Sequence, residues 1–493
     1  MAQPRDLLAI DLGAESGRAI LGTLDDERLS LSVIHRFANT PVRLPDGLHW
    51  DVLRLWDEIK TGIALAIRQQ GRELESIGID TWGVDFGLLD RQGALLANPY
   101  HYRDSRTDGI LAAAFRRLPR QEIFAQTGIQ FMPINSLYQL LAMVIQHSPL
   151  LDVAQTFLTM PDLFNYWLTG RQVSEFSIAT TTQCYDPRQG DWARSLLERF
   201  GIPTHIFPPI VPSGTVLGPL LPAVAAEVGL GNVPIIAPAC HDTASAVAAV
   251  PATGEVVYIS SGTWSLLGTE LPEPIINEQS LAFDFTNEGG VGGTFRFLKN
   301  ITGLWLVQEC RRTWAHQGQE FSYDELTQMA AQATPRRSIV DPDDGEFAKH
   351  GDMPARLRTF CQRTGQPVPQ SPGEVVRCAL ESLALKYRWV LERLETILGR
   401  RLETIHIVGG GAQNRLLCQF TADATGRRVV AGPVEATAIG NIIVQAMALG
   451  HVASLAEGRR LVRHSCALAT YEPVSSPGWE ETYGRLASLM GGT

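Results

Sequence analysis

A short segment near the start of the chain, Asp11–Gly17, constrains the fold more than any other feature. It reads Asp-Leu-Gly-Ala-Glu-Ser-Gly, follows the apolar run Leu7–Ile10 and precedes the largely apolar run Arg18–Leu24. A strand that ends in a carboxylate and a glycine-containing turn can hold a phosphate and its metal ion, because glycine lets backbone N–H groups approach an anion closely. The alternative is a plain tight hairpin, since glycine-rich turns are common.

The residues after this loop distinguish it from two other kinds of phosphate loop. In a P-loop or a dinucleotide-binding fold the next element is a helix, whereas Arg18–Leu24 has the pattern of a strand. A turn at Asp25–Arg28 and a third apolar run, Leu29–Ile34, complete an antiparallel meander. This order predicts an α/β fold of the ribonuclease-H-like type, as in the actin-like and hexokinase-like ATPases.

A second copy of the pattern lies halfway along the chain. Glu255–Thr263 is an apolar strand that ends in Ser-Gly-Thr, and Trp264–Glu270 is a second strand. When Gly13 is aligned with Gly262, both copies carry a Leu-Gly-Thr triplet in the strand after the loop. The repetition predicts two related domains, residues 1–252 and 253–493, which flank a catalytic cleft with one phosphate loop each.

Size and charge narrow the class of protein. A chain of 493 residues with 45% apolar residues has material for two cores. Its net charge of −10, without a Lys/Arg-rich run, disfavours nucleic-acid and membrane partners. We expect no transmembrane helix and no signal peptide, because a long apolar run and a leader pattern are both missing. The seven scattered cysteines suit the cytoplasm, where Cys361 and Cys378 should be free thiols instead of a pair.

Two later strand ends also carry candidate residues. Val233–Asp242 is predicted to be a strand leading into a helix of small residues, with Asp242 at the helix start. The strand Thr404–Val408 runs into Gly409–Gly411, and Asn414 is expected to cap the next helix. Three glycines could let a base or a ribose approach the backbone, or they could form a tight turn. Further helices are predicted over residues 373–400, 435–449 and much of 110–230.

Phosphoryl transfer needs a phosphate cradle, a metal ion, a proton acceptor and positioning. Asp11 is placed to hold Mg²⁺ through water, since that ion keeps several of its waters. Glu15 is expected to face solvent or the metal shell. Asp242 is the candidate general base, with an ordinary pKa near 4; its alternative role is a helix N-cap. His241 could contact a sugar hydroxyl or serve as a structural donor.

The segment Trp82–Asp85 is a candidate platform for a sugar. A Trp ring can pack against a sugar ring while a carboxylate accepts hydrogen bonds from the sugar hydroxyls. The alternative is a core Trp and a surface Asp. Tyr102–Arg106 offers further polar partners or is a solvated loop. The sequence has no His/Cys cluster with zinc spacing and no Gly-x-Ser-x-Gly elbow.

These motifs together resemble the FGGY carbohydrate kinase family over nearly the whole chain, from residue 7 to about residue 470. The resemblance is carried by six segments in a fixed order: Asp11–Arg18, Ile79–Asp90, Cys240–Val247, Ser260–Leu266, Leu298–Gln308 and Val408–Asn414. It implies Mg²⁺- and ATP-dependent phosphorylation of the C1 hydroxyl of L-rhamnulose in rhamnose catabolism, with small molecules as the only expected partners.

The resemblance also implies a role for individual residues. It makes Asp242 the proton acceptor. Contacts to the sugar are implied for Gly83, His241, Asp242, Thr243 and Asn300. Contacts to ATP are implied for Gly13, Ala14, Glu15, Ser16, Gly17, Thr263, Gln308 and Gly410. L-Fuculose or L-ribulose is an alternative acceptor. One or two side chains can distinguish the configuration of a single hydroxyl, so the sequence separates these ketoses poorly. A further alternative is an actin-like ATPase that switches conformation with its nucleotide.

Overall fold

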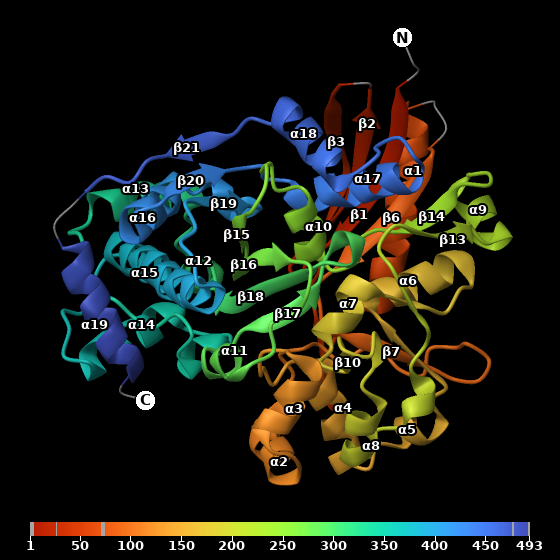
Figure 1. The fold of residues 1–493 in the computed structure, drawn as a ribbon, viewed down its shortest axis with the longest axis horizontal. Coiled ribbons are helices and arrows are strands. Elements are labelled where there is room, and N and C mark those ends of the chain that lie inside the picture. Colours follow the sequence, from red (N-terminus) through yellow and green to blue (C-terminus); the bar gives the residue numbers. More distant parts are fainter. Residues whose placement is uncertain (1–3, 26, 71–73, 476–477, 492–493) are drawn as a thin grey trace. The chain divides into compact units, whose positions relative to one another are not determined.

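A computed structural model describes residues 4–25, 27–70, 74–475 and 478–491 (Figure 1). Contacts within the chain divide it into two compact units. Unit 1 comprises residues 1–253, 270–297 and 436–466, and unit 2 comprises residues 254–269, 298–435 and 467–493. The first segment of unit 1 ends at Thr253, one residue after the domain boundary predicted from the sequence. Two later segments, residues 270–297 and 436–466, also belong to unit 1. The domain pair 1–252 and 253–493 stays a prediction.

The sheet of unit 1 contains the predicted meander. Its strand order is β13–β14–β6–β1–β2–β3. β1 is antiparallel to β2 and parallel to β6. The strands are β1 (Arg5–Leu12), β2 (Ser16–Leu24), β3 (Leu29–Ala38), β6 (Ser76–Thr81), β13 (Thr215–Pro219) and β14 (Pro234–Ala237). The loop is shorter than predicted, because Asp11 belongs to β1 and β2 begins at Ser16. Residue 26 of the predicted turn 25–28 lies outside the described residues. So do residues 1–3, at the N-terminus where no signal peptide is expected.

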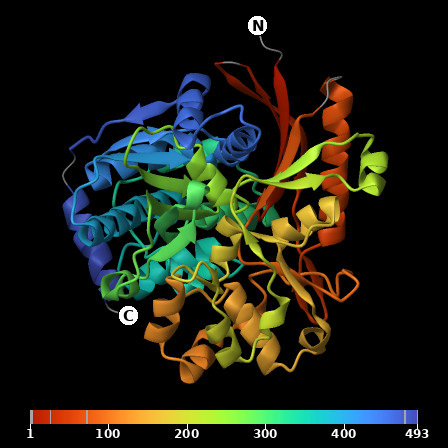
Figure 2. The ribbon, with the colours of Figure 1, turned by 45° about the vertical axis from the view of Figure 1, so that its right-hand side comes forward.

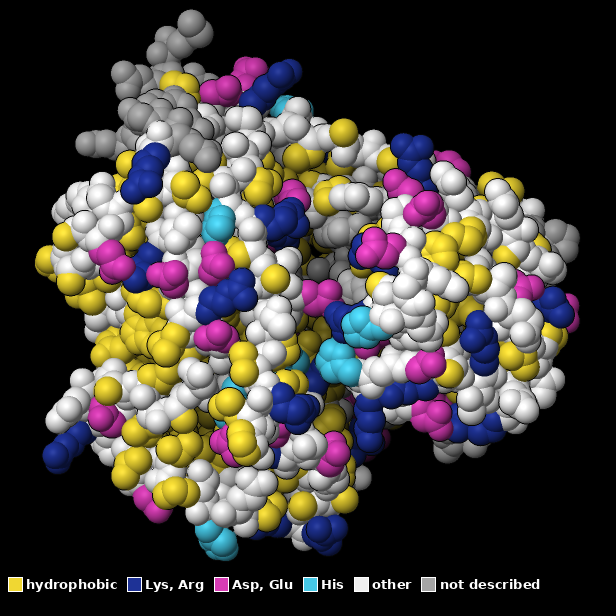
Figure 3. Space-filling view, turned by 180° about the vertical axis from the view of Figure 1, so that it is seen from behind, with side chains coloured by type: hydrophobic (Ala, Val, Ile, Leu, Met, Phe, Trp, Pro, Cys, Tyr) yellow, Lys and Arg dark blue, Asp and Glu magenta, His cyan; other side chains and the backbone are white. Residues whose placement is uncertain are grey.

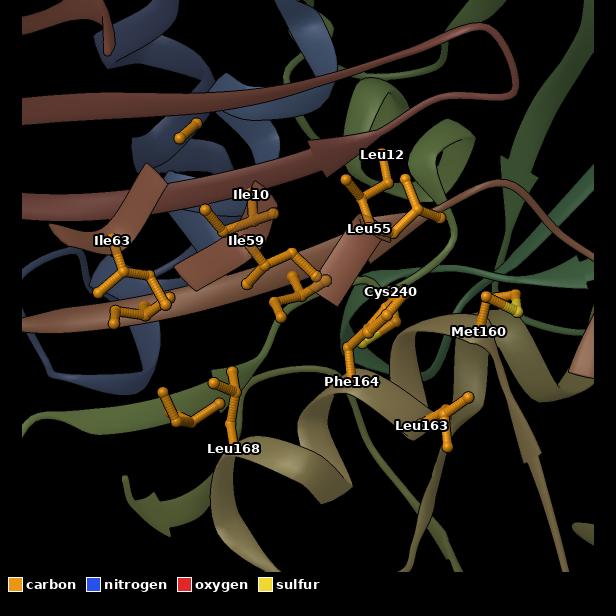
Figure 4. Close-up of a cluster of buried hydrophobic side chains, with 14 of the residues drawn as sticks. Ile10, Leu12, Leu55, Ile59, Ile63, Met160, Leu163, Phe164, Leu168 and Cys240 are labelled. Carbon is orange, nitrogen blue, oxygen red and sulfur yellow. The ribbon is translucent and has the colours of Figure 1, made fainter. Parts of the chain in front are cut away.

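Helices cover both faces of this sheet. Because side chains alternate along a strand, Ile10 and Leu12 of β1 point to one face, where they pack with Leu55 and Ile59 of α1 (Val52–Gln70). Figure 4 shows this core, together with Phe164 from α6 (Met160–Thr169). α1 runs beside the strands in Figure 2. The opposite face carries α17 (Ala436–Ala448), which contacts β1 and β6. Asp11 lies on this second face.

Unit 2 repeats the arrangement. Its strands run in the order β18–β16–β15–β19–β20–β21, and β15 is antiparallel to β16 and parallel to β19. An antiparallel hairpin whose first strand is also paired with a parallel strand therefore occurs in both units, which agrees with the repeat seen in the sequence. The strands are β15 (Val257–Ser261), β16 (Trp264–Leu271), β18 (Phe295–Thr302), β19 (Thr404–Val408), β20 (Arg428–Ala431) and β21 (Ala469–Tyr471). Residues 270–271 at the end of β16 and 295–297 at the start of β18 belong to unit 1.

The N-cap predicted at Asn414 in unit 2 is confirmed. Asn414 precedes α16 (Arg415–Thr425), and its side chain accepts a 3.0 Å hydrogen bond from Leu417 N. α15 (Pro372–Leu398) ends at Gly399, which has the left-handed φ of 68° that favours glycine there. The other helices of unit 2 are α12 (Trp305–His316), α13 (Tyr323–Gln332), α14 (Met353–Arg363) and α19 (Trp479–Gly491).

The region 110–230 is largely helical, as predicted, but short strands interrupt it. Its helices are α2 (Ile110–Arg117), α3 (Arg120–Thr127), α4 (Ser136–Ile145), α5 (Pro149–Val153), α7 (Phe176–Thr181), α8 (Arg194–Phe200) and α9 (Pro222–Val228). Its short strands are β8 (Thr156–Thr159), β9 (Ser174–Glu175), β10 (Tyr185–Asp186), β11 (Asp191–Trp192) and β12 (Ile210–Val211). Elsewhere unit 1 has β4 (Val42–Leu44), β5 (Gly47–His49), β7 (Phe86–Leu89), β17 (Thr286–Gly289), α10 (Asp242–Ala248), α11 (Glu278–Ala282) and α18 (Leu455–Ser465).

The state of the cysteines agrees with the expectation from the sequence. All seven cysteines are free, Cys361 and Cys378 included. On the face in Figure 3, basic and acidic side chains are interspersed among the described residues. No helix in the described part of the chain combines the length and the hydropathy that crossing a membrane requires.

Candidate active site

The hairpin between β1 and β2 is held by its own backbone and by Asn39, the residue after β3. Gly13 N donates a 3.0 Å hydrogen bond to Ser16 O, so this N–H is already used within the turn. Asn39 donates through its side chain to Gly13 O at 2.9 Å and through its backbone to Glu15 O at 3.0 Å. A side chain at Gly17 would collide with the Phe37 ring. Packing alone therefore accounts for a glycine at this position. The loop is therefore a braced hairpin.

Two carboxylates lie at the ends of β1 and β6. Asp11 is paired in register with Asp80, which sequence reasoning gave no role. Asp11 Oδ2 accepts from Arg18 Nη2 at 2.6 Å. Asp80 is fully buried; its Oδ2 accepts from Asn441 Nδ2 at 2.6 Å, while its Oδ1 has no hydrogen-bond partner. Burial, and then the charge of Asp11, raises the pKa of Asp80 well above its ordinary value.

These carboxylates offer only part of a metal site. The described residues contain no group of three or more His, Cys, Asp or Glu side chains that could hold a metal ion. Mg²⁺ in phosphoryl-transfer sites is commonly held by one or two carboxylates, with waters and phosphates completing its shell. Asp11 with the open Oδ1 of Asp80 fits that pattern.

Asp242 occupies the first turn of α10, but it is not the helix cap. The cap residue is His241, which has an extended backbone with φ of −80° and ψ of 120°. The N-cap alternative for Asp242 is therefore wrong. Asp242 Oδ1 accepts from Thr243 N at 2.6 Å and from Thr243 Oγ1 at 3.2 Å. Its Oδ2 makes no hydrogen bond to the described residues.

The electrostatic setting of Asp242 also differs from the prediction. Its side chain keeps 28% of its surface exposed. Burial of the rest raises the pKa of Asp242 above its ordinary value, against the opposing effect of His241. The expected ordinary pKa is therefore wrong, and the ionised carboxylate is a stronger proton acceptor than a solvated Asp.

The backbone before Asp242 is fixed by a buried acid from β9. Cys240 N donates to Glu175 Oε2 at 3.0 Å, and His241 N donates to Ser177 Oγ at 3.1 Å. Thr81 N at the end of β6 donates to Cys240 O at 2.9 Å. These bonds bring the ends of β6 and β14 together, and with them Asp80 and Asp242.

Gly83 lies beside His241. A Cβ atom at Gly83 would stand 3.3 Å from His241 Nε2 and 3.2 Å from Thr181 Oγ1, both tight contacts. Val84, the next residue, has a φ of 69° at the centre of a γ-turn closed by Asp85 N and Gly83 O at 3.0 Å. A left-handed φ is strained for a β-branched residue. The turn is held by Ser136 Oγ, which donates to Val84 O.

Asp85 does not present a free carboxylate to a sugar, contrary to the prediction for Trp82–Asp85. It is buried and accepts from Trp50 Nε1 at 2.6 Å, Trp82 Nε1 at 3.0 Å, Gln139 Nε2 at 2.8 Å and Tyr102 N at 3.2 Å. Burial nevertheless raises its pKa to about 6. Trp82 is also buried. Asp85 thus organises the aromatic side chains around it.

The second loop and the triple glycine meet within unit 2. A Cβ atom at Gly411 would collide with Ser261 Oγ, and one at Gly409 would stand 3.0 Å from Ser261 O. Gly409 also needs its left-handed φ of 82°. Packing therefore explains two of the three glycines. Gly410 is exposed, and a Cβ atom there would meet nothing within 4 Å. Its open surroundings fit a ligand that approaches the backbone.

The remaining predicted residues of unit 2 lie around the same loop. Thr263 O accepts from Gly303 N at 3.2 Å and Trp305 N at 3.1 Å, which ties the loop to the start of α12. Gln308 lies one turn further along α12, and its buried Oε1 has no hydrogen-bond partner. Asn300 lies on β18 and is partly buried. The orphaned oxygen of Gln308 supports a contact with a ligand.

Sequence reasoning missed several residues that the structure brings to these sites. Asp80 could have been found, because the ends of parallel strands share one sheet edge. No usable sequence signal marked Asn39, Glu175 or Asn441, since each reaches its partner through tertiary structure alone. The same holds for Arg296, whose Nη2 lies 3.0 Å from His241 Nδ1.

Comparison with known proteins gives a consistent result. The models for the N-terminal and C-terminal domains of the FGGY family of carbohydrate kinases match residues 7–249 and 257–449. A protein named rhamnulokinase from Bacteroides thetaiotaomicron is 46% identical over 97% of this chain and 98% of its own length. Another from Oceanobacillus iheyensis is 42% identical over 96% of this chain and 99% of its own.

Solved structures show the same fold at lower identity. A xylulose kinase from Lactobacillus acidophilus superposes with a TM-score of 0.82 at 17% identity, covering 99% of this chain and 98% of that one. A gluconate kinase from the same organism gives a TM-score of 0.81 at 16% identity, with the same coverage.

Proposed function

Because this chain belongs to the FGGY family of carbohydrate kinases, we propose that it transfers the γ-phosphoryl group of ATP to the C1 hydroxyl of L-rhamnulose. The choice of sugar is supported by relatives named rhamnulokinase, which are 41–46% identical over 94–97% of this chain. The product is L-rhamnulose 1-phosphate, as expected for a step of L-rhamnose catabolism.

The single observation in this chain that carries the proposal is the carboxylate of Asp242. One of its oxygens is held by Thr243, and the other makes no hydrogen bond to the described residues. As the C1 oxygen bonds to the γ-phosphorus, its proton passes to Oδ2 of Asp242. The bond from the γ-phosphorus to the bridging oxygen breaks, and that oxygen leaves with the electron pair as part of ADP. The raised pKa of Asp242 favours this proton transfer.

We assign the sugar contacts to Gly83, His241, Thr243 and Asn300. The missing side chain of Gly83 leaves room next to His241 Nε2. Thr243 acts partly through its hydrogen bonds to Asp242.

Nucleotide contacts are assigned to the hairpin residues Gly13–Gly17 and to Thr263, Gln308 and Gly410. The orphaned Gln308 oxygen and the open space at Gly410 support this assignment. Asp11 and Asp80 would hold Mg²⁺, which when bound supplies positive charge to the transferring phosphates. Arg18 keeps Asp11 oriented through their ion pair.

We infer a cytoplasmic enzyme, because all seven cysteines are free thiols, which a reducing compartment maintains.

The decisive experiment couples ADP release to a panel of ketoses that includes L-rhamnulose, L-fuculose and L-ribulose. We expect the highest kcat/KM with L-rhamnulose and a 1-phosphate as the product by NMR. A higher kcat/KM for another ketose would reassign the substrate. Equal ADP release with and without any sugar would favour a nucleotide-switch ATPase.

A further inference from the structure

We infer that Arg296, held by Glu288, is a positioning residue that fixes His241 in the tautomer with its proton on Nε2. The N–H group then faces Asp242 and the space beside Gly83. The catalytic consequence rests on the proposed kinase activity, whereas the tautomer is a property of the protein without substrate.

Arg296 reaches His241 from β18 and is fully buried. Its Nη2 lies 3.0 Å from His241 Nδ1 and 3.2 Å from Glu288 Oε2, and its Nε donates to Gly289 O at 2.8 Å. The carboxylate and the carbonyl therefore orient the guanidinium toward the imidazole ring.

This contact decides which ring nitrogen carries the proton. Arginine only donates hydrogen bonds and keeps its charge in proteins, so His241 Nδ1 must accept at 3.0 Å. A neutral imidazole carries one proton, which therefore lies on Nε2. In the other tautomer two N–H groups would oppose each other, and Glu288 Oε2 is 3.4 Å from Nδ1, too far to compensate well.

The proton on Nε2 points toward the reacting groups. Nε2 lies 3.4 Å from Asp242 Oδ1 and 3.3 Å from the Cβ position of Gly83. An N–H donor in this place favours the ionised form of Asp242 and can donate to a substrate oxygen beside Gly83. A lone pair at Nε2 would instead repel the carboxylate.

The cost of burying Arg296 supports a functional role. Its Nη1 is buried without a hydrogen-bond partner. A buried ion pair with an orphaned nitrogen contributes less to stability than apolar residues of the same volume. The role of Arg296 in positioning His241 accounts for keeping a buried arginine that contributes little to stability.

The tautomer can be observed directly. We would label the full-length protein with ¹⁵N-histidine and record both ring nitrogens of His241 at mildly alkaline pH, identifying them by their loss in His241→Gln. We expect Nε2 protonated in the wild type and a mixture of tautomers in Arg296→Met. A wild-type His241 with its proton on Nδ1 would overturn the inference without any variant at Arg296.

Kinetics test the consequence. We expect kcat/KM for the ketose to fall about 10- to 100-fold in Arg296→Met, the size of one hydrogen bond to a charged group, with the KM for ATP unchanged. Arg296→Lys should recover part of the loss, and Glu288→Gln should show a smaller loss. His241→Gln should retain more activity than His241→Asn, because only the Gln amide nitrogen can stand at the Nε2 position.

The matched control is Arg377→Met, which breaks another buried pair, Arg377 with Glu381 at 2.8 Å. It should lower stability and leave both the tautomer and the ketose KM unchanged. An equal loss of kcat/KM in this control would mean that Arg296 acts only through stability. If the wild type phosphorylates no ketose, the proposed function fails, yet the ¹⁵N spectra still decide the tautomer.

Discussion

Asp11 and Asp80 are register partners in the parallel pair of β1 and β6, so the two acids project from the same face of the unit 1 sheet. Each carboxylate has a different partner. Asp11 forms an ion pair with Arg18, and Asp80 accepts a hydrogen bond from Asn441. The Oδ1 atom of Asp80 is left without a partner. This pairing gives the predicted magnesium ligand Asp11 a neighbour with a free acceptor.

Magnesium dependence should therefore involve both acids. In Asp80→Asn we expect the Mg²⁺ concentration for half-maximal activity to rise at least about 10- to 100-fold, the loss in metal affinity seen even when a group that only supports a metal ligand is replaced. Asp11→Asn should shift it at least as far. Both are measured as ADP release against free Mg²⁺ at saturating ATP. Asp57→Asn, whose side chain is 79% exposed on α1, is the control and should change nothing. Wild-type Mg²⁺ dependence in Asp80→Asn would remove Asp80 from the site.

Replacing the proton acceptor should affect the rate far more than binding. Asp242→Asn keeps the size of the side chain and the acceptor for Thr243, but it cannot take a proton. We expect kcat to fall about 10²- to 10⁴-fold, the usual contribution of general-base catalysis. Ketose affinity, measured by calorimetry, should be largely kept. A variant with normal turnover would show that another group accepts the proton.

The two neighbouring glycines of the triple-glycine turn should respond differently to alanine. In Gly411→Ala the new methyl group collides with Ser261, so we expect the free energy of unfolding to fall by about 1–3 kcal/mol. In Gly410→Ala the methyl group meets no protein atom within 4 Å. That variant should unfold like the wild type and raise the KM for ATP about tenfold, because the methyl group enters the proposed nucleotide space. An unchanged KM for ATP would place the nucleotide elsewhere.

Stability should depend on pH through Asp162 on α6. Burial raises the pKa of Asp162 to about 7, although Thr159, Ser174 and Glu175 N donate to it. In the unfolded chain its pKa is near 4. Between these values the folded protein binds a proton that the unfolded chain has lost, so the free energy of unfolding falls as pH rises. The total fall is up to about 4 kcal/mol.

Asp162→Asn should flatten this slope in urea unfolding between pH 5 and pH 8. Its oxygen can still accept from Glu175 N, and its amide can donate to the two hydroxyls. Burial also raises the pKa of Glu175, so part of the slope should persist. Asp152→Asn, at an exposed position, serves as the comparison. Identical slopes in wild type and Asp162→Asn would assign the pH dependence to other groups.

Local features explain which parts of the fold were predictable. Residues close together in the chain determine the meander β1–β3, its counterpart at β15–β16, the cap at Asn414 and the helix end at Gly399. Errors came where distant residues intervened. Asp85 was expected to meet a sugar, but Trp50 and Gln139, far away in sequence, saturate it.

The sequence by itself determined the α/β class, the repeated hairpin, the family and the candidate residues, because periodicity and motif spacing are local properties of the chain. Only the tertiary structure decided the chemistry around those residues: the pairing of Asp11 with Asp80, the free oxygen of Asp242 and the contact of Arg296 with His241. The physical reason is that burial and charge pairing depend on partners that folding brings together from distant positions. The loop at Gly13 was visible as a motif, but its bracing by Asn39 was not.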